Sequence, residues 1–245
     1  MRRSLALLLL VAAAALAAGC HTVVTVDVDA ATDGSGTVDV TATLDPQAAA
    51  ALGGAERLAL DDLAKAGWTV DPPVAGKDGG LTFSAHRHYR DGADLAAVLD
   101  EVGGKGGVFT ATSAAASHAF GRTSHEAGTT VKVSGDPAQF SDAALAQTLG
   151  GPPLGWTPEE LAAAGASTPG AGELVVRVDV PGSDGPTERR FDLTNGKAQE
   201  ATVAAESTVV APLPLGLAAA AAVAVVVGLV LLVVGLRRRR QERHS

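Results

Sequence analysis

The residues of this 245-residue chain best suited to metal chemistry are two closely spaced histidines. His86 and His88 lie two positions apart, so on a strand their imidazoles share one face and could bind a transition metal together. A third ligand would be needed, and His118 and His125 are the candidates. The alternative is a solvated strand end, which requires no metal. We therefore predict no metal site.

A second group with possible chemistry consists of aspartates near the N-terminal end of the chain. Asp27, Asp29 and Asp39 could gather on the outer face of a predicted hairpin, with Asp33 in its turn. Clustered carboxylates suit calcium, but the spacing of a calcium-binding loop is absent from the sequence. We therefore expect an acidic, soluble strand face.

Two tryptophans are the remaining candidates for a binding site. Trp68 and Trp156 could line a cleft for a lipid or a glycan, although core packing or a contact beside a helix would also explain them. The sequence contains no G-x-S-x-G, H-E-x-x-H, G-x-x-x-x-G-K or strand-linked G-x-G-x-x-G motif. We predict that the chain is not an enzyme and uses no cofactor.

The composition excludes several classes of protein. The residues between Cys20 and Ala211 include 26 acidic and 12 basic side chains, a difference of -14, and aromatic residues make up 3% of the chain. This charge repels phosphate backbones, and few aromatic rings are present to stack on bases. A single cysteine also rules out an intramolecular disulfide and a cysteine-based zinc site. We expect no nucleic-acid partner.

The N-terminus is typical of an export signal. Arg2 and Arg3 precede 14 apolar residues, 5–18, which would span about 21 Å as a helix, less than the roughly 30 Å of a bilayer core. The sole cysteine, Cys20, follows Leu-Ala-Ala-Gly, which resembles the lipobox of bacterial lipoproteins. We therefore predict a signal peptide at 1–19 and acylation of Cys20.

The C-terminal part is predicted to anchor the chain a second time. Residues 213–236 form an uncharged run of 24 residues, about 36 Å as a helix, followed by four arginines. Clustered arginines stay on the cytoplasmic side. We expect a transmembrane helix at 213–236, a cytoplasmic basic tail at 237–245 and an extracytoplasmic domain at 20–206.

The pattern of the extracytoplasmic domain mixes strands and helices. Alternating apolar residues predict strands at 23–29, 81–85 and 174–180, and Leu95, Val98, Leu99 and Val102 are spaced for one face of a helix that Asp91 can cap. Asn195-Gly196 predicts a hairpin turn into a last strand at 201–210. We expect an α+β fold, with an antiparallel β-sheet and two or three packed short helices.

Several of these features together resemble one family. They are the lipobox at Cys20, the Asp-Gly-Ser-Gly-Thr-Val hairpin at 33–38, the Gly67-Trp68 pair, the strand that ends at Pro181-Gly182 and the C-terminal apolar run with its arginines. The chain thereby resembles the LppM-like lipoproteins of actinobacteria over nearly its whole length. The resemblance implies an LppM domain that contacts envelope lipids or glycolipids, and it supplies no catalytic residues.

These expectations combine into one functional hypothesis. We predict a non-enzymatic lipoprotein at the cell membrane that binds envelope lipid or lipoglycan in a cleft walled by the strands and by the Leu95 face of the helix. Salt should weaken such binding little. The alternative is a protein-interaction scaffold that recruits an envelope protein through an exposed sheet edge or through residues 138–172.

Overall fold

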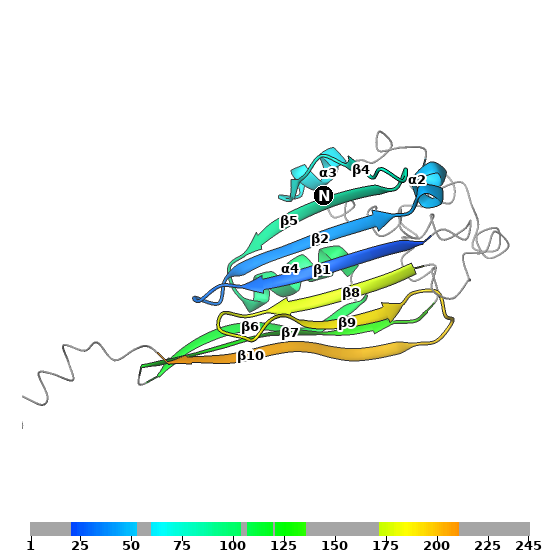
Figure 1. Ribbon diagram of the computed structural model, residues 1–245. Coiled ribbons are helices and arrows are strands. Elements are labelled where there is room, and N and C mark those ends of the chain that lie inside the picture. Colours follow the sequence, from blue (N-terminus) through cyan, green and yellow to red (C-terminus); the bar gives the residue numbers. More distant parts are fainter. Residues whose placement is uncertain (1–20, 53–59, 104–106, 120, 136–171, 211–245) are drawn as a thin grey trace, which may run out of the picture. The chain divides into compact units, whose positions relative to one another are not determined.

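The computed structural model describes residues 21–52, 60–103, 107–119, 121–135 and 172–210. In this part of the chain the strands form two sheets, and three helices accompany them (Figure 1). The strands are β1 (Thr22–Ala30), β2 (Gly36–Leu44), β3 (Thr69–Val70), β4 (Val74–Ala75), β5 (Leu81–Tyr89), β6 (Phe109–Ala119), β7 (Arg122–Val133), β8 (Gly172–Asp179), β9 (Thr187–Asp192) and β10 (Gln199–Val210). The helices are α2 (Pro46–Leu52), α3 (Leu60–Lys65) and α4 (Gly92–Gly103).

The larger sheet has seven strands. Their order is β3-β5-β2-β1-β8-β9, and β4 also pairs with β5. β1 pairs with β2 in antiparallel fashion, but it pairs with β8 in parallel. Val24, Val26 and Val28 of β1 point to one face and are buried, so the residues between them point to the opposite face. One face of this sheet therefore belongs to the core, and the other carries the polar side chains.

The smaller sheet consists of β10, β7 and β6, in that order. Threonines link its strands: the hydroxyl groups of Thr112 and Thr129 lie 2.9 Å apart, and those of Thr130 and Thr202 lie 3.0 Å apart. Ala111 of β6 has a φ of 49°, a left-handed conformation that is strained for alanine. A positive φ inside a strand is typical of a β-bulge.

Helix α4 supplies the largest helical part of the core. The Asp91 carboxylate caps it by accepting a hydrogen bond from Asp94 N at 2.9 Å. The predicted apolar face is confirmed, because its four residues are at most 1% exposed: Leu95, Val98, Leu99 and Val102. These residues join valines of both sheets in one buried cluster, and Figure 1 shows α4 behind β1 and β2.

Gly36, at the start of β2, is required by the packing around it. Its Cα approaches the buried ring of Tyr89 so closely that an added Cβ would lie 2.4 Å from the phenolic oxygen. The Tyr89 hydroxyl donates a hydrogen bond to the carbonyl oxygen of Asp29 at 3.4 Å. Burial raises the pKa of Tyr89 to about 12. This contact fixes the end of the β1–β2 hairpin against β5.

The described residues fall into two compact units. The first contains the described residues up to Ser117 and those from Ser124 to Thr208. The second groups His118–Thr123 with Val209 and Val210. Within this second unit, His118 Nδ1 lies 2.9 Å from the Thr123 hydroxyl oxygen.

The α+β prediction is wrong, because the described residues form a mostly β domain. Two of its strands, β6 and β7, are 11 and 12 residues long. Their alanines, serines and threonines lack the apolar alternation that reveals a strand. The sheet is also mixed rather than antiparallel, because β1 and β8 run parallel.

The transmembrane helix that completed the fold prediction is not supported. No helix among the described residues is long and apolar enough to cross a membrane. The predicted span at 213–236, the signal peptide at 1–19 and the tail at 237–245 all lie outside the described residues. The prediction took the length and apolarity of the run as sufficient for a spanning helix.

The predicted hairpin at Asn195-Gly196 is also wrong. Gly196 has the positive φ of a tight turn, 66°. However, β9 pairs with β8, whereas β10 pairs with β7 in the other sheet. The turn therefore carries the chain from one sheet to the other, which a local turn motif does not reveal.

Candidate acidic binding site

The polar face of the seven-stranded sheet carries a row of charged residues across five strands. The strand register places each member directly beside the next. In order from β5 to β9 the row consists of His86, Asp39, Asp27, Arg177 and Glu188. Asp39, Asp27 and Arg177 alternate with buried valines along β2, β1 and β8, so the period of two that builds the core also aligns these charges.

A second row lies one step nearer the end of β1. Asp29 of β1 faces Thr37 of β2 and Asp179 of β8. Asp179 also holds the turn after β8, because its carboxylate accepts hydrogen bonds from Val180 N at 2.9 Å and from the Ser183 hydroxyl at 2.6 Å. The two rows together place five carboxylates close to one another.

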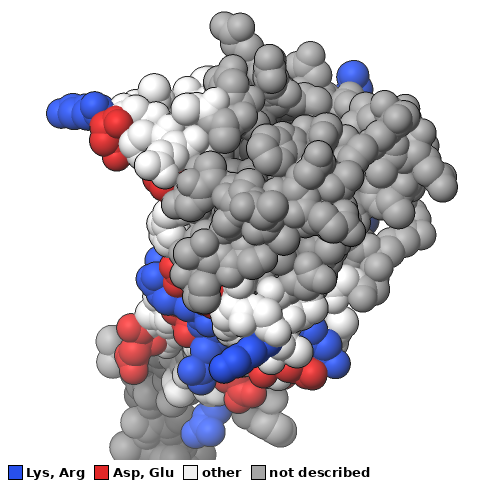
Figure 2. Space-filling view, turned by 90° about the vertical axis from the view of Figure 1, so that its right-hand side faces the viewer, with Lys and Arg blue, Asp and Glu red and all other residues white. Residues whose placement is uncertain are grey.

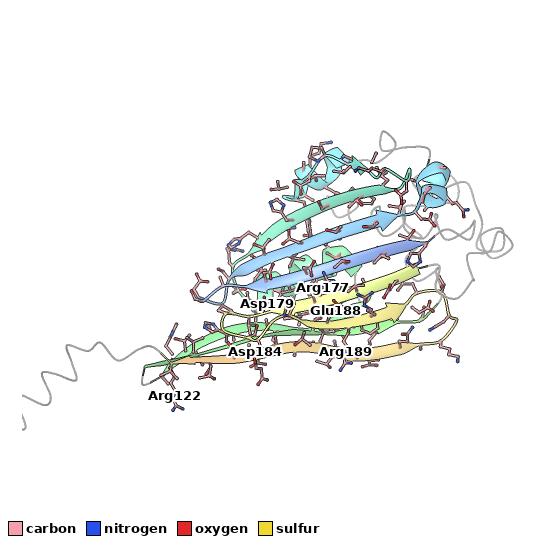
Figure 3. All side chains as sticks on the ribbon, in the orientation of Figure 1. Arg122, Arg177, Asp179, Asp184, Glu188 and Arg189 are labelled. Carbon is pink, nitrogen blue, oxygen red and sulfur yellow. The ribbon has the colours of Figure 1, made fainter. Side chains whose placement is uncertain are left out.

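These rows line a hollow of about 430 Å³ in the surface. We call it the acidic hollow, and its lining consists of Asp27, Val28, Asp29, Asp39, Arg177, Asp179, Pro186 and Glu188. Figure 3 shows Arg177, Asp179 and Glu188 on neighbouring strands at this part of the sheet. The lining has five carboxylates and one guanidinium, so it offers many hydrogen-bond acceptors and few donors.

One side of the acidic hollow is neutralised by ion pairs. Arg177 Nε lies 2.7 Å from Glu188 Oε2, and Arg177 Nη1 lies 3.7 Å from Asp27 Oδ1. Arg190 contacts the other oxygen of Glu188 at 2.7 Å and reaches Glu173 Oε1 at 3.1 Å. Hydrogen bonds from Arg177 and Arg190 lower the pKa of Glu188. This side is a network of alternating charges, which fixes the side chains in place.

The other side of the acidic hollow lacks such compensation. Within the ranges that the structure describes, the carboxylates of Asp29 and Asp39 make no ion pair. Burial raises the pKa of Asp29, and the charges of Asp39 and Asp179 raise it further. Burial also raises the pKa of Asp39; His86 acts in the opposite direction, and the charge of Asp71 adds a smaller increase. These two carboxylates are therefore available acceptors.

Asp27 lies between the two sides. Burial is the main cause of its raised pKa, and the negative charges of Asp29 and Asp39 act in the same direction. Arg177 acts against this increase but does not overcome it. Asp27 therefore has one attractive neighbour, Arg177, and two repulsive neighbours, Asp29 and Asp39.

The predicted gathering of Asp27, Asp29 and Asp39 is confirmed. Asp27, Asp29 and Asp39 all line the acidic hollow. Asp33 lies in the hairpin turn, as predicted, where its carboxylate accepts hydrogen bonds from Ser35 N at 3.0 Å and from the Ser35 hydroxyl at 2.6 Å. No set of three or more His, Cys, Asp or Glu side chains in the described ranges could hold a metal ion.

The histidine candidates do not form a cluster. His86 and His88 share the polar face of β5, as predicted, but His118 and His125 belong to strands of the smaller sheet. His125 is buried, and its Nδ1 has no hydrogen-bond partner within the described part of the chain. Only His86 stands in the row that borders the acidic hollow.

Of the tryptophan and cysteine candidates, only Trp68 lies among the described residues. Trp68 is 3% exposed, and its Nε1 donates a hydrogen bond to Glu101 Oε2 at 3.4 Å. Glu101 also pairs with Arg87 of β5, so Trp68 belongs to the packing between α4 and the sheet. Trp156 and Cys20 lie outside the described residues. The expected apolar cleft at the Leu95 face of α4 is filled by core side chains.

Sequence reasoning missed the partners that come from β8 and β9. Arg177, Asp179 and Glu188 lie about 150 residues from Asp27 along the chain, and the parallel pairing of β1 with β8 brings them together. The alternation of Leu174, Val176 and Val178 does place Arg177 and Asp179 on a polar face. It gives no information on which strand lies beside them.

Comparisons with protein-family models, with curated proteins and with solved structures find no match to this chain.

Proposed function

We propose that the chain is a non-enzymatic lipoprotein of the LppM-like kind, acylated at Cys20 and held at the extracytoplasmic side of the cell membrane. Its role is to bind the hydroxyl-bearing part of an envelope lipid or lipoglycan in the acidic hollow. The observation that carries this proposal is the chemistry of the lining, five carboxylates around one guanidinium. Carboxylates accept hydrogen bonds from hydroxyl groups, and arginine donates to oxygen atoms.

The division of the acidic hollow into two sides supports this choice. On one side, Arg177 is fixed between Asp27 and Glu188 and still presents donors to the hollow. On the other side, Asp29 and Asp39 remain unneutralised. A sugar offers both hydroxyl donors and oxygen acceptors, so it can satisfy both sides at once. An acyl chain can satisfy neither, because it has no polar atoms.

The experiment uses the full chain carrying Cys20→Ser, which has no other cysteine to acylate, and measures its binding to phosphatidylcholine vesicles with and without a lipid that carries a long oligosaccharide. We expect binding only to the glycolipid vesicles, with a large loss in Asp39→Asn and in Arg177→Met. Glu206→Gln is the matched control, because Glu206 is an exposed carboxylate of β10 that does not line the acidic hollow. Equal loss in the control, or none in the hollow variants, would contradict the proposed site.

Salt dependence and product analysis test the remaining parts of the proposal. A neutral sugar bound by hydrogen bonds should be held almost equally at low and high ionic strength, because no charge is screened. Binding that disappears at high salt would show that charge attraction holds the vesicles and would contradict recognition of a neutral sugar by hydrogen bonds. Hydrolysis of the glycolipid during the experiment would overturn the non-enzymatic assignment.

Acylation is tested separately. The full chain should incorporate labelled palmitate in an actinobacterial host, and Cys20→Ser should abolish the label because this chain has no other cysteine. Label that persists in Cys20→Ser would show that Cys20 is not the acylated residue.

A further inference from the structure

The position of the acidic hollow relative to Cys20 limits the ligands that can reach it. The chain enters the first compact unit at the start of β1, next to Cys20. His21 N donates a hydrogen bond to Asp45 Oδ2 at 2.6 Å, and Asp45 N donates one to the His21 carbonyl at 3.0 Å. These bonds tie His21 to the end of β2, and the Cα atom of the residue before it is only about 3.8 Å away. An acyl group on Cys20 would hold this end of the sheet at the membrane surface.

The start of β10 lies at the same end of the sheet as the start of β1. Gln199, at the start of β10, donates a hydrogen bond to the Asp192 carbonyl at 2.6 Å. Asp192 pairs with Glu173, which pairs with Val23 near the start of β1. The start of β10 thus lies level with the start of β1. Figure 2 views the side of the molecule on which this end lies, and basic and acidic residues are interspersed on it.

The acidic hollow lies toward the opposite end. Asp29 is close to the end of β1, and it pairs with Asp179, the last residue of β8. Ser207, near the end of β10, donates a hydrogen bond to the Pro181 carbonyl just beyond β8. β1, β8 and β10 therefore run in the same direction, away from Cys20 and toward the hollow.

The separation follows from the geometry of a strand. Asp27 lies six positions and Asp29 eight positions after His21, so at about 3.3 Å per residue the hollow begins about 20 to 26 Å from His21 along the strand. The polar layer of a bilayer adds only about 5 to 8 Å on each side of its hydrocarbon core. The headgroup of a simple lipid does not extend that far.

Charge supports an upright orientation of the strands. The acidic hollow has four more negative than positive side chains in its lining, and residues between 20 and 211 have a charge difference of -14. An anionic membrane surface repels such a face, so the sheet does not lie with the hollow against the bilayer. The opposite face of the sheet is covered by the buried core.

We infer that the acidic hollow binds sugars that extend beyond the headgroup layer, namely the outer part of a long glycan carried by a lipoglycan. This inference rests on the proposed function. It restricts the ligand class to glycans that are long enough to extend from the membrane to the hollow. A glycolipid with a single sugar in the same bilayer cannot enter the hollow. A free oligosaccharide with the chemistry of the long glycan can enter it.

The first test uses the full chain reconstituted in phosphatidylcholine vesicles, with three probes. They are a monohexosyl diacylglycerol in the same bilayer, a lipid with a long oligosaccharide in the same bilayer, and that oligosaccharide free in solution. We expect affinity for the single-sugar lipid to be at least roughly tenfold weaker than for the other two. Equal affinity for the single-sugar lipid would overturn the inference while leaving the proposed function intact. Absence of binding to all three would overturn the proposed function itself.

The second test measures orientation and needs no ligand. Asp184→Cys places a fluorophore in the exposed turn between β8 and β9, which leads to the hollow (Figure 3). Lys197→Cys places the same fluorophore at the exposed segment before β10, at the Cys20 end. A dye in the membrane surface should quench the Lys197→Cys label strongly and the Asp184→Cys label weakly. Equal quenching would show that the strands lie along the membrane and would overturn the inference.

Discussion

Asp39→Asn should stabilise the protein at neutral pH. Asp39 faces Asp27 directly across neighbouring strands, and the raised pKa of Asp39 shows that its charge is unfavourable in the folded state. Facing side chains of an antiparallel pair have Cβ atoms about 5 Å apart. Two unit charges at about 5 Å repel each other by about 0.8 kcal/mol in water and by about 3 kcal/mol at an effective dielectric constant of about 20.

The lower part of this range applies, because Asp39 is only half-buried and solvent screens its charge. We expect the free energy of unfolding to rise by about 1 kcal/mol, which corresponds to about 2 to 4 °C in Tm for a chain of this size. The measurement is urea unfolding of the purified full chain in detergent, followed by circular dichroism.

The stability that Asp39→Asn adds should decrease as the pH falls. A folded-state pKa above the ordinary aspartate value of 3.8 means that the folded protein binds the Asp39 proton more tightly than the unfolded chain does. The destabilisation is therefore fully present above the folded-state pKa and disappears as the pH falls toward 3.8. The advantage of Asp39→Asn should shrink in the same window. A variant less stable than the parent at neutral pH, or an advantage that is unchanged at about pH 4, would refute the reasoning.

Asp94→Asn is the matched control with the opposite sign. The Asp94 carboxylate accepts hydrogen bonds from Arg90 Nε and Arg90 N, and these bonds lower its pKa. Its charge therefore contributes stability above the unfolded-state pKa, and that contribution is lost as the pH falls. The control variant should be less stable than the parent at neutral pH and should approach it in acid.

Three further substitutions test the packing. Gly36→Ala should lower the free energy of unfolding by about 3 kcal/mol, because its methyl group would lie 2.4 Å from the Tyr89 hydroxyl oxygen; a cost below about 1 kcal/mol in urea unfolding would contradict the tight contact. Ala111→Gly should raise it by about 0.5 to 1 kcal/mol, because glycine adopts a φ of 49° without strain; a fall in Tm would show that Ala111 is not strained. Leu99→Ala should cost about 2 to 5 kcal/mol, because Leu99 is 1% exposed in the core; a loss of less than about 1 kcal/mol in urea would show that α4 does not contribute to the core.

Much of the local structure was predictable from the sequence. The alternating valines of β1 and β8 and the helical spacing of Leu95 and Leu99 identified buried faces, because these periods depend only on neighbouring residues. β6 and β7 carry alanine, serine and threonine instead of alternating apolar residues. Their length therefore left no signal in the sequence.

The acidic hollow was predictable only in part, for the same reason. Asp27 and Asp39 belong to one hairpin, so their proximity follows from a short turn. Arg177 joins them through the pairing of β1 with β8, whose first residues, Thr22 and Gly172, are 150 positions apart. Parallel pairing has no local turn that sets its register, and the sequence pattern fits several neighbours equally well.

The distribution of charge on the polar face indicates what the carboxylates are for. Solubility alone does not require them to be adjacent, because Thr25 and Thr41 keep the same face polar nearer the Cys20 end of β1. Asp29 and Asp39 instead both line the acidic hollow, where burial raises the pKa of each and the charge of Asp39 raises that of Asp29 further. Groups that reduce stability in the free protein are typical of binding and catalytic sites, where a ligand supplies the missing partners. A ligand that donates hydroxyl groups to these two carboxylates removes the conflict, and the fixed Arg177 beside them gives the ligand one orientation.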